Sequence, residues 1–138
     1  MPIYLKLNHA WGIQKTIVNA QGSQKKELKE NARPALTRPP ERLNEYHTIL
    51  LVYPNWWSTM PMCVWSFLEE QTCNPNVIAP ICTHEGSGMG KSEQDIKELC
   101  PNVHVERGLA IVGSQAAHCD DVLEPWITAL SQRLESYE

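Results

Sequence analysis

Apolar residues form continuous runs in the last two thirds of the chain. Two of these runs, His47–Tyr53 and Val77–Thr83, are typical of strands that are covered on both faces of a parallel sheet. A shorter run, Val103–Val112, is interrupted at Gly108 and predicts one short strand or a pair of strands. Pro80 lies inside the second run and predicts a bulge or an irregular pairing there.

Helical patterns follow the apolar runs. The spacing of apolar residues predicts helices over Met60–Glu70, Ser92–Leu99 and Asp120–Leu134. Ser92 is the expected N-cap of the second helix, with Asp95 at its third helical position. Strands that alternate with helices in this way imply right-handed crossovers and a parallel sheet.

The amino-terminal third has a different pattern. Ile3, Leu5 and Leu7 alternate as in a strand, and Gln24–Asn31 reads as a charged, weakly amphipathic helix. Three prolines in Pro34–Pro40 end that helix. We find no internal repeat and no low-complexity tract, so we interpret the proline-rich stretch as a connection within a single domain, 1–138.

Composition narrows the classes of function. A chain of 138 residues is the size of one domain, and a net charge of −4 with no basic cluster gives no electrostatic footprint for nucleic acid. No apolar run approaches the roughly 20 residues that span a bilayer, so we expect no membrane insertion and a cytoplasmic location. Five cysteines without a CxxC pair fit reduced thiols better than a disulfide framework.

Two loops carry the candidate chemistry. Trp56 and Trp57 follow the first apolar run directly, and the glycine-rich stretch His84–Gly90 follows the second. Ligands of open α/β sheets bind at the carboxyl ends of the strands. Trp56 and Trp57 fit a core or interface role, because tryptophan is usually buried for its large apolar area. Adjacent positions on a strand-end loop cannot both face one core, however, so contact of one indole with a planar ligand is the alternative.

These residues resemble the flavodoxin-like proteins, in particular a subgroup of small flavodoxins with the motifs YPxWWxTMP and THxGSGxG. Here residues 53–64 read YPNWWSTMPMCV, and residues 83–101 read THEGSGMGKSEQDIKELCP. Glu30–Leu36 also resembles the helix exit that precedes the third strand in that subgroup. The resemblance covers the chain from about Lys25 to its carboxyl end, which leaves 1–24 as an atypical amino-terminal segment.

The resemblance implies an α/β fold, a flavodoxin-like three-layer sandwich with a parallel sheet of strand order 2-1-3-4-5. It also implies an FMN site between the two loops, because aromatic faces stack on a flavin and glycine backbone brings N–H donors to its polar edge. Electron transfer or reduction would follow, with a redox partner protein or a small-molecule electron acceptor and without a catalytic acid, base or nucleophile. The cofactor-binding residues expected on this basis are Pro54, Asn55, Trp56, Trp57, Thr83, His84, Glu85, Gly86, Ser87 and Gly88.

The chain departs from the family at its amino end. Members of the family begin with an apolar strand and a hydroxyl-rich phosphate loop at a helix N-terminus, and nothing in 1–24 resembles these. We therefore expect the first strand and helix to be abbreviated or replaced, and FMN to bind weakly. The strand His47–Tyr53 would become an exposed edge, and a homodimerisation site, unless Ile3–Leu7 or a second subunit covers it. The alternative function is a flavin-free remnant that dimerises or binds a partner.

Other interpretations of the loops are weaker. Gly86–Ser92 invites a nucleotide P-loop assignment, but Glu85 stands where that pattern needs glycine and would repel phosphates. Near a flavin, Glu85 would disfavour a reduced anion, although it could equally be a solvated carboxylate. Trp126 is expected to anchor the core, and Cys82 to be an inert core thiol.

Three Cys/His pairs are candidate metal or nucleophile sites. Structural zinc takes a closed set of four ligands at recognisable spacing, whereas these pairs are scattered over different elements, so no metal site is expected. The pairs are Cys82 with His84, Cys100 with His104, and His118 with Cys119.

Overall fold

The computed structural model describes residues 3–6, 12–14, 24–36, 42–70 and 76–136. Its strands are β1 (Ile3–Lys6), β2 (Gly12–Gln14), β3 (Thr48–Pro54), β4 (Val77–His84), β5 (His104–Val105) and β6 (Leu109–Val112). Its helices are α1 (Gln24–Lys29), α2 (Met62–Glu70), α3 (Ser92–Leu99) and α4 (Asp120–Glu135), with 3-10 turns η1 (Leu43–Glu45) and η2 (Gly113–His118). Each helix or strand predicted in the described residues is present, with bounds shifted by two residues or less at most ends.

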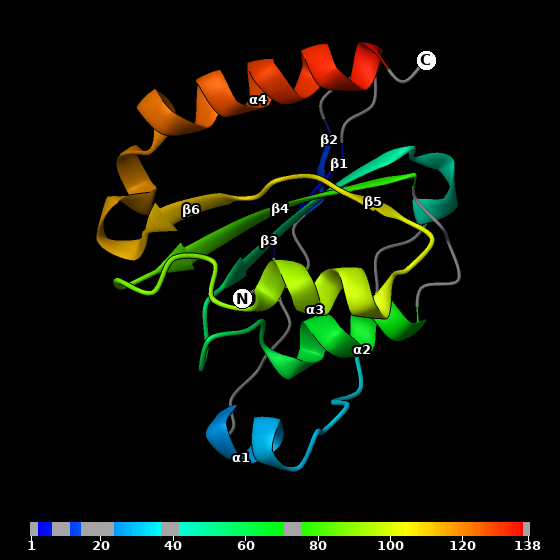
Figure 1. Ribbon diagram of the computed structural model, residues 1–138, viewed down its shortest axis with the longest axis vertical. Coiled ribbons are helices and arrows are strands. Elements are labelled where there is room, and N and C mark those ends of the chain that lie inside the picture. Colours follow the sequence, from blue (N-terminus) through cyan, green and yellow to red (C-terminus); the bar gives the residue numbers. More distant parts are fainter. Residues whose placement is uncertain (1–2, 7–11, 15–23, 37–41, 71–75, 137–138) are drawn as a thin grey trace.

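The elements form three layers (Figure 1). The sheet lies between α2 and α3 on one face and α4 on the other, and α1 packs beyond α2. Its strand order is β2-β1-β3-β4-β5, with β6 paired to β4 beyond the end of β5. The pairs of β4 with β3, β5 and β6 are parallel. The predicted three-layer α/β fold is therefore confirmed.

The amino-terminal strands differ in direction from those of a fully parallel sheet. β1 pairs antiparallel with both β2 and β3, in a register that sets Ile3 beside Val52 and Lys6 beside Ile49. The long apolar strand β3 is thus covered by the chain's own first strand, one of the two expected ways of covering it. The reason for expecting a homodimer at that edge disappears with it.

Both faces of β3 are buried, as its continuous apolar sequence predicts. Alternate residues Ile49, Leu51 and Tyr53 belong to the core cluster under α2 and α3. Leu50 points to the opposite face, where it forms a smaller cluster with Ala79 and with Leu130 of α4. Trp126 packs against this second cluster, so its predicted role as a core anchor is confirmed.

Pro80 is accommodated without a bulge in the β3–β4 ladder. It stands opposite Leu51 in regular parallel register. The irregularity lies on the other side of β4, where pairing passes from β5 to β6 across the break at residues 106–108. The Ile78 carbonyl oxygen accepts from the Glu106 N–H on that side, so the amide position two residues later faces the break. Proline, which has no N–H, leaves no unpaired donor there.

The predicted N-cap of α3 is wrong. Ser92 is the first helical residue and Lys91 is the N-cap, without a side-chain capping bond. The Ser92 hydroxyl is fully buried: it donates to the Met89 carbonyl oxygen at 2.6 Å and accepts from the Tyr53 hydroxyl at 2.8 Å. The competing bond across the core explains why a good N-cap residue does not cap this helix.

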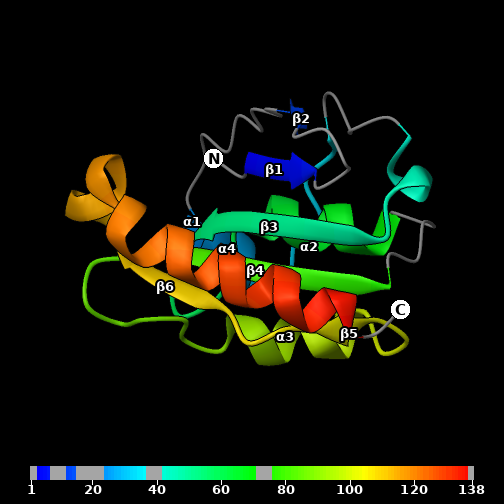
Figure 2. The same cartoon turned by 90° about the horizontal axis from the view of Figure 1, so that it is seen from above.

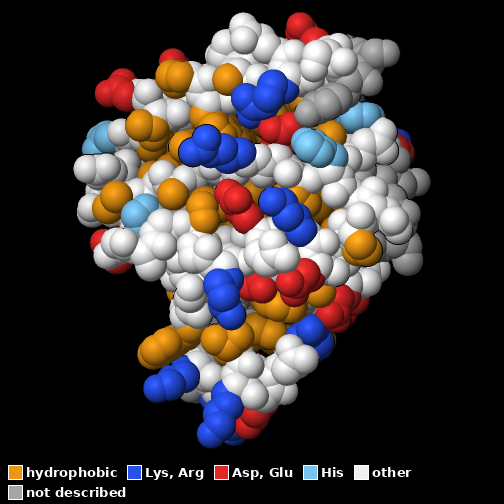
Figure 3. All heavy atoms as spheres, in the orientation of Figure 1, with side chains coloured by type: hydrophobic (Ala, Val, Ile, Leu, Met, Phe, Trp, Pro, Cys, Tyr) orange, Lys and Arg blue, Asp and Glu red, His pale blue; other side chains and the backbone are white. Residues whose placement is uncertain are grey.

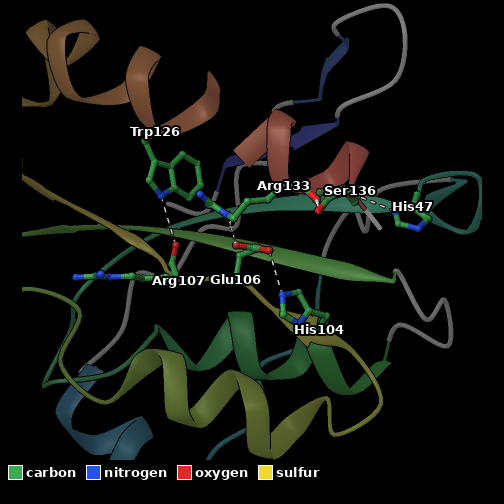
Figure 4. A network of polar contacts seen from close by, with 8 residues as sticks. His47, His104, Glu106, Arg107, Trp126, Arg133 and Ser136 are labelled. Atoms are coloured by element: carbon green, nitrogen blue, oxygen red, sulfur yellow. Dashed lines mark hydrogen bonds and ion pairs between the residues drawn. The ribbon is translucent and has the colours of Figure 1, made fainter. Parts of the chain in front are cut away.

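A buried carboxylate fastens α4 to the sheet (Figure 4). Glu106, only 5% exposed, accepts from Arg133 Nε of α4 at 3.0 Å and lies 3.0 Å from His104 Nε2. Trp126 Nε1 of the same helix donates to the Arg107 carbonyl oxygen at 3.4 Å. Because a buried carboxylate needs charged or N–H partners, this cluster fixes how α4 sits on the sheet.

Arg133→Ala should lower the free energy of unfolding by about 1–3 kcal/mol, because it leaves the buried Glu106 carboxylate short of a charged donor. Urea denaturation measures the change. Arg107→Ala is the matched control, since within the described residues the Arg107 side chain makes no ion pair, and it should cost less than about 0.5 kcal/mol. Equal losses in the two variants would contradict the role assigned to Arg133.

Candidate functional site

The two predicted loops lie side by side at one rim of the sheet. Pro54, the last residue of β3, stands opposite Thr83 of β4 in the parallel ladder. The Asn55 N–H donates to the Thr83 carbonyl oxygen at 2.7 Å, and Asn55 Nδ2 donates to the Gly88 carbonyl oxygen at 2.8 Å. Asn55 therefore ties the tryptophan loop to the glycine-rich loop.

The tryptophan loop is a tight turn. Trp56 and Thr59 exchange backbone hydrogen bonds, and the residues between them, Trp57 and Ser58, have φ of 56° and 71°. Two positive φ values at the centre of a four-residue turn are typical of type I′, a geometry that usually needs glycine or asparagine. The turn presents Trp57, 57% exposed, and Lys25 Nζ lies 5.0 Å from the centroid of its ring. Trp56 is half-buried.

A second contact holds this turn against the glycine-rich loop. The Lys91 N–H donates to the Ser58 carbonyl oxygen at 2.6 Å. Gly90 has φ of 54°, and a Cβ on it would collide with that oxygen and lie 2.8 Å from the Ser58 carbonyl carbon. Gly90 is thus required both by its backbone conformation and by the close approach of the turn.

The start of the glycine-rich loop is open. Gly86 and Gly88 have φ of 130° and 60°, and a Cβ on either would meet nothing within 4 Å. Within the described part of the chain, the amides of Ser87 and Gly88 donate no hydrogen bond. The Gly86 N–H donates to His84 Nδ1 at 2.9 Å. The loop therefore offers unobstructed N–H donors to a ligand.

The Glu85 side chain contacts the segment that follows β6. Its carboxylate lies against Gly113 at the end of β6, where a Cβ on Gly113 would collide with a carboxylate oxygen. The Glu85 residue is exposed. The side chain is therefore at the rim of the site and next to the loop. This position fits both roles considered for Glu85, a solvated carboxylate and a group that tunes a bound cofactor.

Residues next to the two loops are mostly buried and joined by hydrogen bonds. The Thr59 hydroxyl donates to the Asp95 carboxylate of α3, and the Tyr53 hydroxyl donates to Ser92. Burial raises the pKa of Tyr53 above its ordinary value and that of the Cys82 thiol to about 12. A fully buried Cys82 with such a pKa is an inert thiol, as predicted.

The structure argues against a nucleotide-binding P-loop in the glycine-rich stretch. Ser92 occupies the position of the magnesium-binding hydroxyl in a P-loop, but here that hydroxyl is buried and engaged by Tyr53 and Met89.

Among the described residues, no group of three or more His, Cys, Asp or Glu side chains is placed to hold a metal ion. In the same residues, no helix is long and apolar enough to cross a bilayer. On the face shown in Figure 3, basic and acidic side chains are interspersed and form no continuous basic field.

The structure brings together the residues predicted for the site, which lie in 54–57 and 83–88 at one rim. Sequence reasoning missed Ser58, Gly90 and Lys25. Gly90 was visible as the last glycine of its run, but the partner that requires it, the Ser58 carbonyl group, is set by the three-dimensional approach of two loops.

Comparisons with known protein families match most of the chain. The family profile Flavodoxin_4, described as Flavodoxin, matches residues 4–130, which extends the match well beyond Lys25 toward the amino end. No curated protein matches the chain.

Two solved structures share the fold, both of proteins named "putative flavoprotein". The one from Bacteroides uniformis has a TM-score of 0.67 and 24% identity, covering 76% of this chain and 65% of its own. The one from Bacteroides eggerthii has a TM-score of 0.60 and 24% identity, covering 67% of this chain and 59% of its own. This chain thus matches less than two thirds of the length of either structure.

Gly90→Ala should lower the free energy of unfolding by at least about 1 kcal/mol more than Gly88→Ala. Both variants force alanine into a positive φ, but only the first drives a Cβ into the Ser58 carbonyl group. Thermal or urea unfolding of the pair isolates the steric part, because the backbone part is common to both. Equal destabilisation would show that the two loops do not meet at Gly90.

Proposed function

This chain belongs to the flavodoxin family, and from that premise we propose that it binds FMN between residues 54–57 and 83–88 and acts as an electron-transfer or oxidoreductase protein with a weakened phosphate site. The observation that supports the proposal most strongly is that hydrogen bonds from Asn55 and from the Lys91 amide join the tryptophan loop to the glycine-rich loop at one rim of the sheet. Membership of the family alone would not support FMN binding, because proteins that share a fold do not always keep the same ligand.

The residues present fit an isoalloxazine ring. Trp57 offers an exposed indole for stacking, and Trp56 flanks it. Open Gly86 and Gly88 allow a flat molecule to approach the backbone, where the amides of Ser87 and Gly88 would donate to its polar edge. Pro54 and Asn55 shape the turn, while Thr83, His84 and Glu85 line the start of the second loop.

FMN would supply the redox chemistry, and the chain's own groups would bind and orient it. Donors aimed at the polar edge favour the reduced, anionic ring. His84 accepts from the Gly86 N–H through Nδ1, which ties its ring to the start of the loop. The electron partner in this proposal is a redox protein or a small-molecule acceptor, and a cytoplasmic location fits the free cysteines among the described residues.

The direction of β1 supports a weakened phosphate site. Because β1 is antiparallel to β3, its carboxyl end lies beside the amino-terminal part of β3, away from the rim where the loops meet. The carboxyl end of β1, at Lys6, is therefore at the end of the sheet opposite the rim that carries Trp57, and a phosphate loop in the family follows the carboxyl end of the first strand. The phosphate would lose charge-assisted bonds worth about 1.5–3 kcal/mol each.

The test is a comparison of FMN with riboflavin, which lacks the phosphate. We expect FMN to bind with a Kd above about 1 μM, and riboflavin to bind within about tenfold of it. Visible absorption during titration measures both constants. Trp57→Ala should weaken both flavins by a similar factor of about two to ten, because stacking is common to them, and Trp57→Phe should restore part of the loss.

Two outcomes would contradict parts of this proposal. Sub-micromolar FMN binding with a large preference over riboflavin would show that a phosphate site exists. A protein that stays colourless in excess FMN would support the alternative function, a flavin-free remnant that binds a partner, whose supporting feature is the lack of a phosphate-loop motif in 1–24.

Glu85→Gln should raise the midpoint potential of bound flavin. The carboxylate at the rim disfavours a reduced anion, so removing its charge makes reduction easier, by about 10–20 mV in the two-electron midpoint potential for an interaction of about 0.5–1 kcal/mol. Spectroelectrochemical titration measures the potential. The matched control is Glu98→Gln, an exposed carboxylate near the far end of α3, which should leave the potential unchanged. A potential unaffected by Glu85→Gln would place that carboxylate outside the field of the flavin.

A further inference from the structure

A hollow lies beside the loops, between β6, η2 and the start of α4. Its volume is about 470 Å³, within the range of small-molecule sites. Figures 1 and 2 place η2 at the tip of β6, where α4 begins and where β4 also ends. Apolar Val112 and Val122 line it together with the polar side chains of Ser114, Gln115, His118 and Asp121.

The β6 wall of the hollow is directly joined to the candidate flavin loop. Ile111 and Val112 pair with Thr83 and His84 of β4. Adjacent strands lie about 4.8 Å apart, so a molecule in the hollow would be a near neighbour of that loop. The Glu85 carboxylate packs on Gly113, which directly precedes Ser114 in the lining of the hollow.

Ile111 in the β6 wall of the hollow is buried, but the walls that η2 and Val122 contribute are exposed. None of the six residues of η2 is buried. Val122 is 50% exposed and, with Trp57, is one of the two large apolar side chains that the described residues expose. Both lie near the carboxyl ends of the strands: Trp57 is in the tryptophan loop, and Val122 lines the hollow. An apolar wall left in water at such a rim is a feature of ligand sites.

The side chains that line the hollow favour a neutral ligand with a hydrogen-bond acceptor. Ser114, Gln115 and His118 supply hydrogen-bond donors to an acceptor such as a carbonyl oxygen. Asp121 and, at the margin, Glu85 place negative charge around the hollow, while no lysine or arginine of the described residues lines it. An anionic ligand would therefore be repelled, whereas a neutral one would not.

We infer that this hollow is a second binding site, for a small neutral ring compound that carries a carbonyl oxygen. The ring packs on Val112 and Val122, and the donors from η2 hold the carbonyl oxygen. This site goes beyond the proposed flavin site, and none of the residues that line it belongs to that site, although Glu85 borders both. The two sites can therefore be tested separately.

Chromone and chromone-2-carboxylate are suitable probes, because they differ by one carboxylate. In 1H–15N spectra of the full chain, chromone should shift amides of residues 110–122, with a Kd of about 0.1–1 mM. Chromone-2-carboxylate should bind at least about fivefold more weakly, and Asp121→Asn should narrow that difference.

Val122→Trp should fill the hollow and weaken chromone binding at least about tenfold, while FMN titration stays unchanged. Thr128→Trp is the matched control, because it adds the same indole to an exposed position of the same helix that does not line the hollow. The control should bind chromone as the parent chain does.

Three results would overturn the second site. They are no shift in residues 110–122 at about 1 mM chromone, equal binding of the neutral and anionic probes, and unchanged binding in Val122→Trp. Failure of FMN to bind would leave the second site standing and would count against the proposed function alone.

Discussion

The parallel pairing of β3 with β4 is the constraint on which the fold and the candidate site depend. Because the two strands run in the same direction and in register from Thr48 to Pro54, both must end at the same rim. Burial on both faces, by α2 and α3 below and α4 above, leaves the strand-end loops as the places where these two strands meet solvent. A ligand site in this part of the molecule is therefore confined to those loops.

The sequence was sufficient for the architecture from residue 48 onward. Continuous apolar runs identified the buried strands β3 and β4, whereas the run interrupted at Gly108 left one short strand or a pair open, and the structure has the pair β5 and β6. The same reasoning placed the tryptophan and glycine-rich loops at one edge, because consecutive parallel strands leave no other arrangement. These predictions depend on periodicity and chain direction, which are properties of the local sequence.

Contacts between distant residues were beyond that reasoning. Ser92 is a favourable N-cap by type, yet Tyr53 recruits its hydroxyl into the core. The antiparallel direction of β1 could not be read from alternating Ile3 and Leu5, because an alternating pattern fits either direction. The closeness of Ser58 to Gly90 likewise depends on how two loops approach each other. In each case a partner remote in sequence decides the outcome.

The turn that carries Trp57 has a consequence for how the site is held in shape. Two consecutive L-residues at positive φ are unfavourable in an isolated chain, by roughly 1–2 kcal/mol each, so the turn exists because its surroundings impose it. Those surroundings are Asn55, Thr59 and the Lys91 amide. The indole is thus preorganised at the expense of backbone strain. A turn without this strain would make the protein more stable, but it would leave Trp57 less well ordered. Ligand binding would then have to order the indole, and this entropy cost would lower the affinity for the ligand.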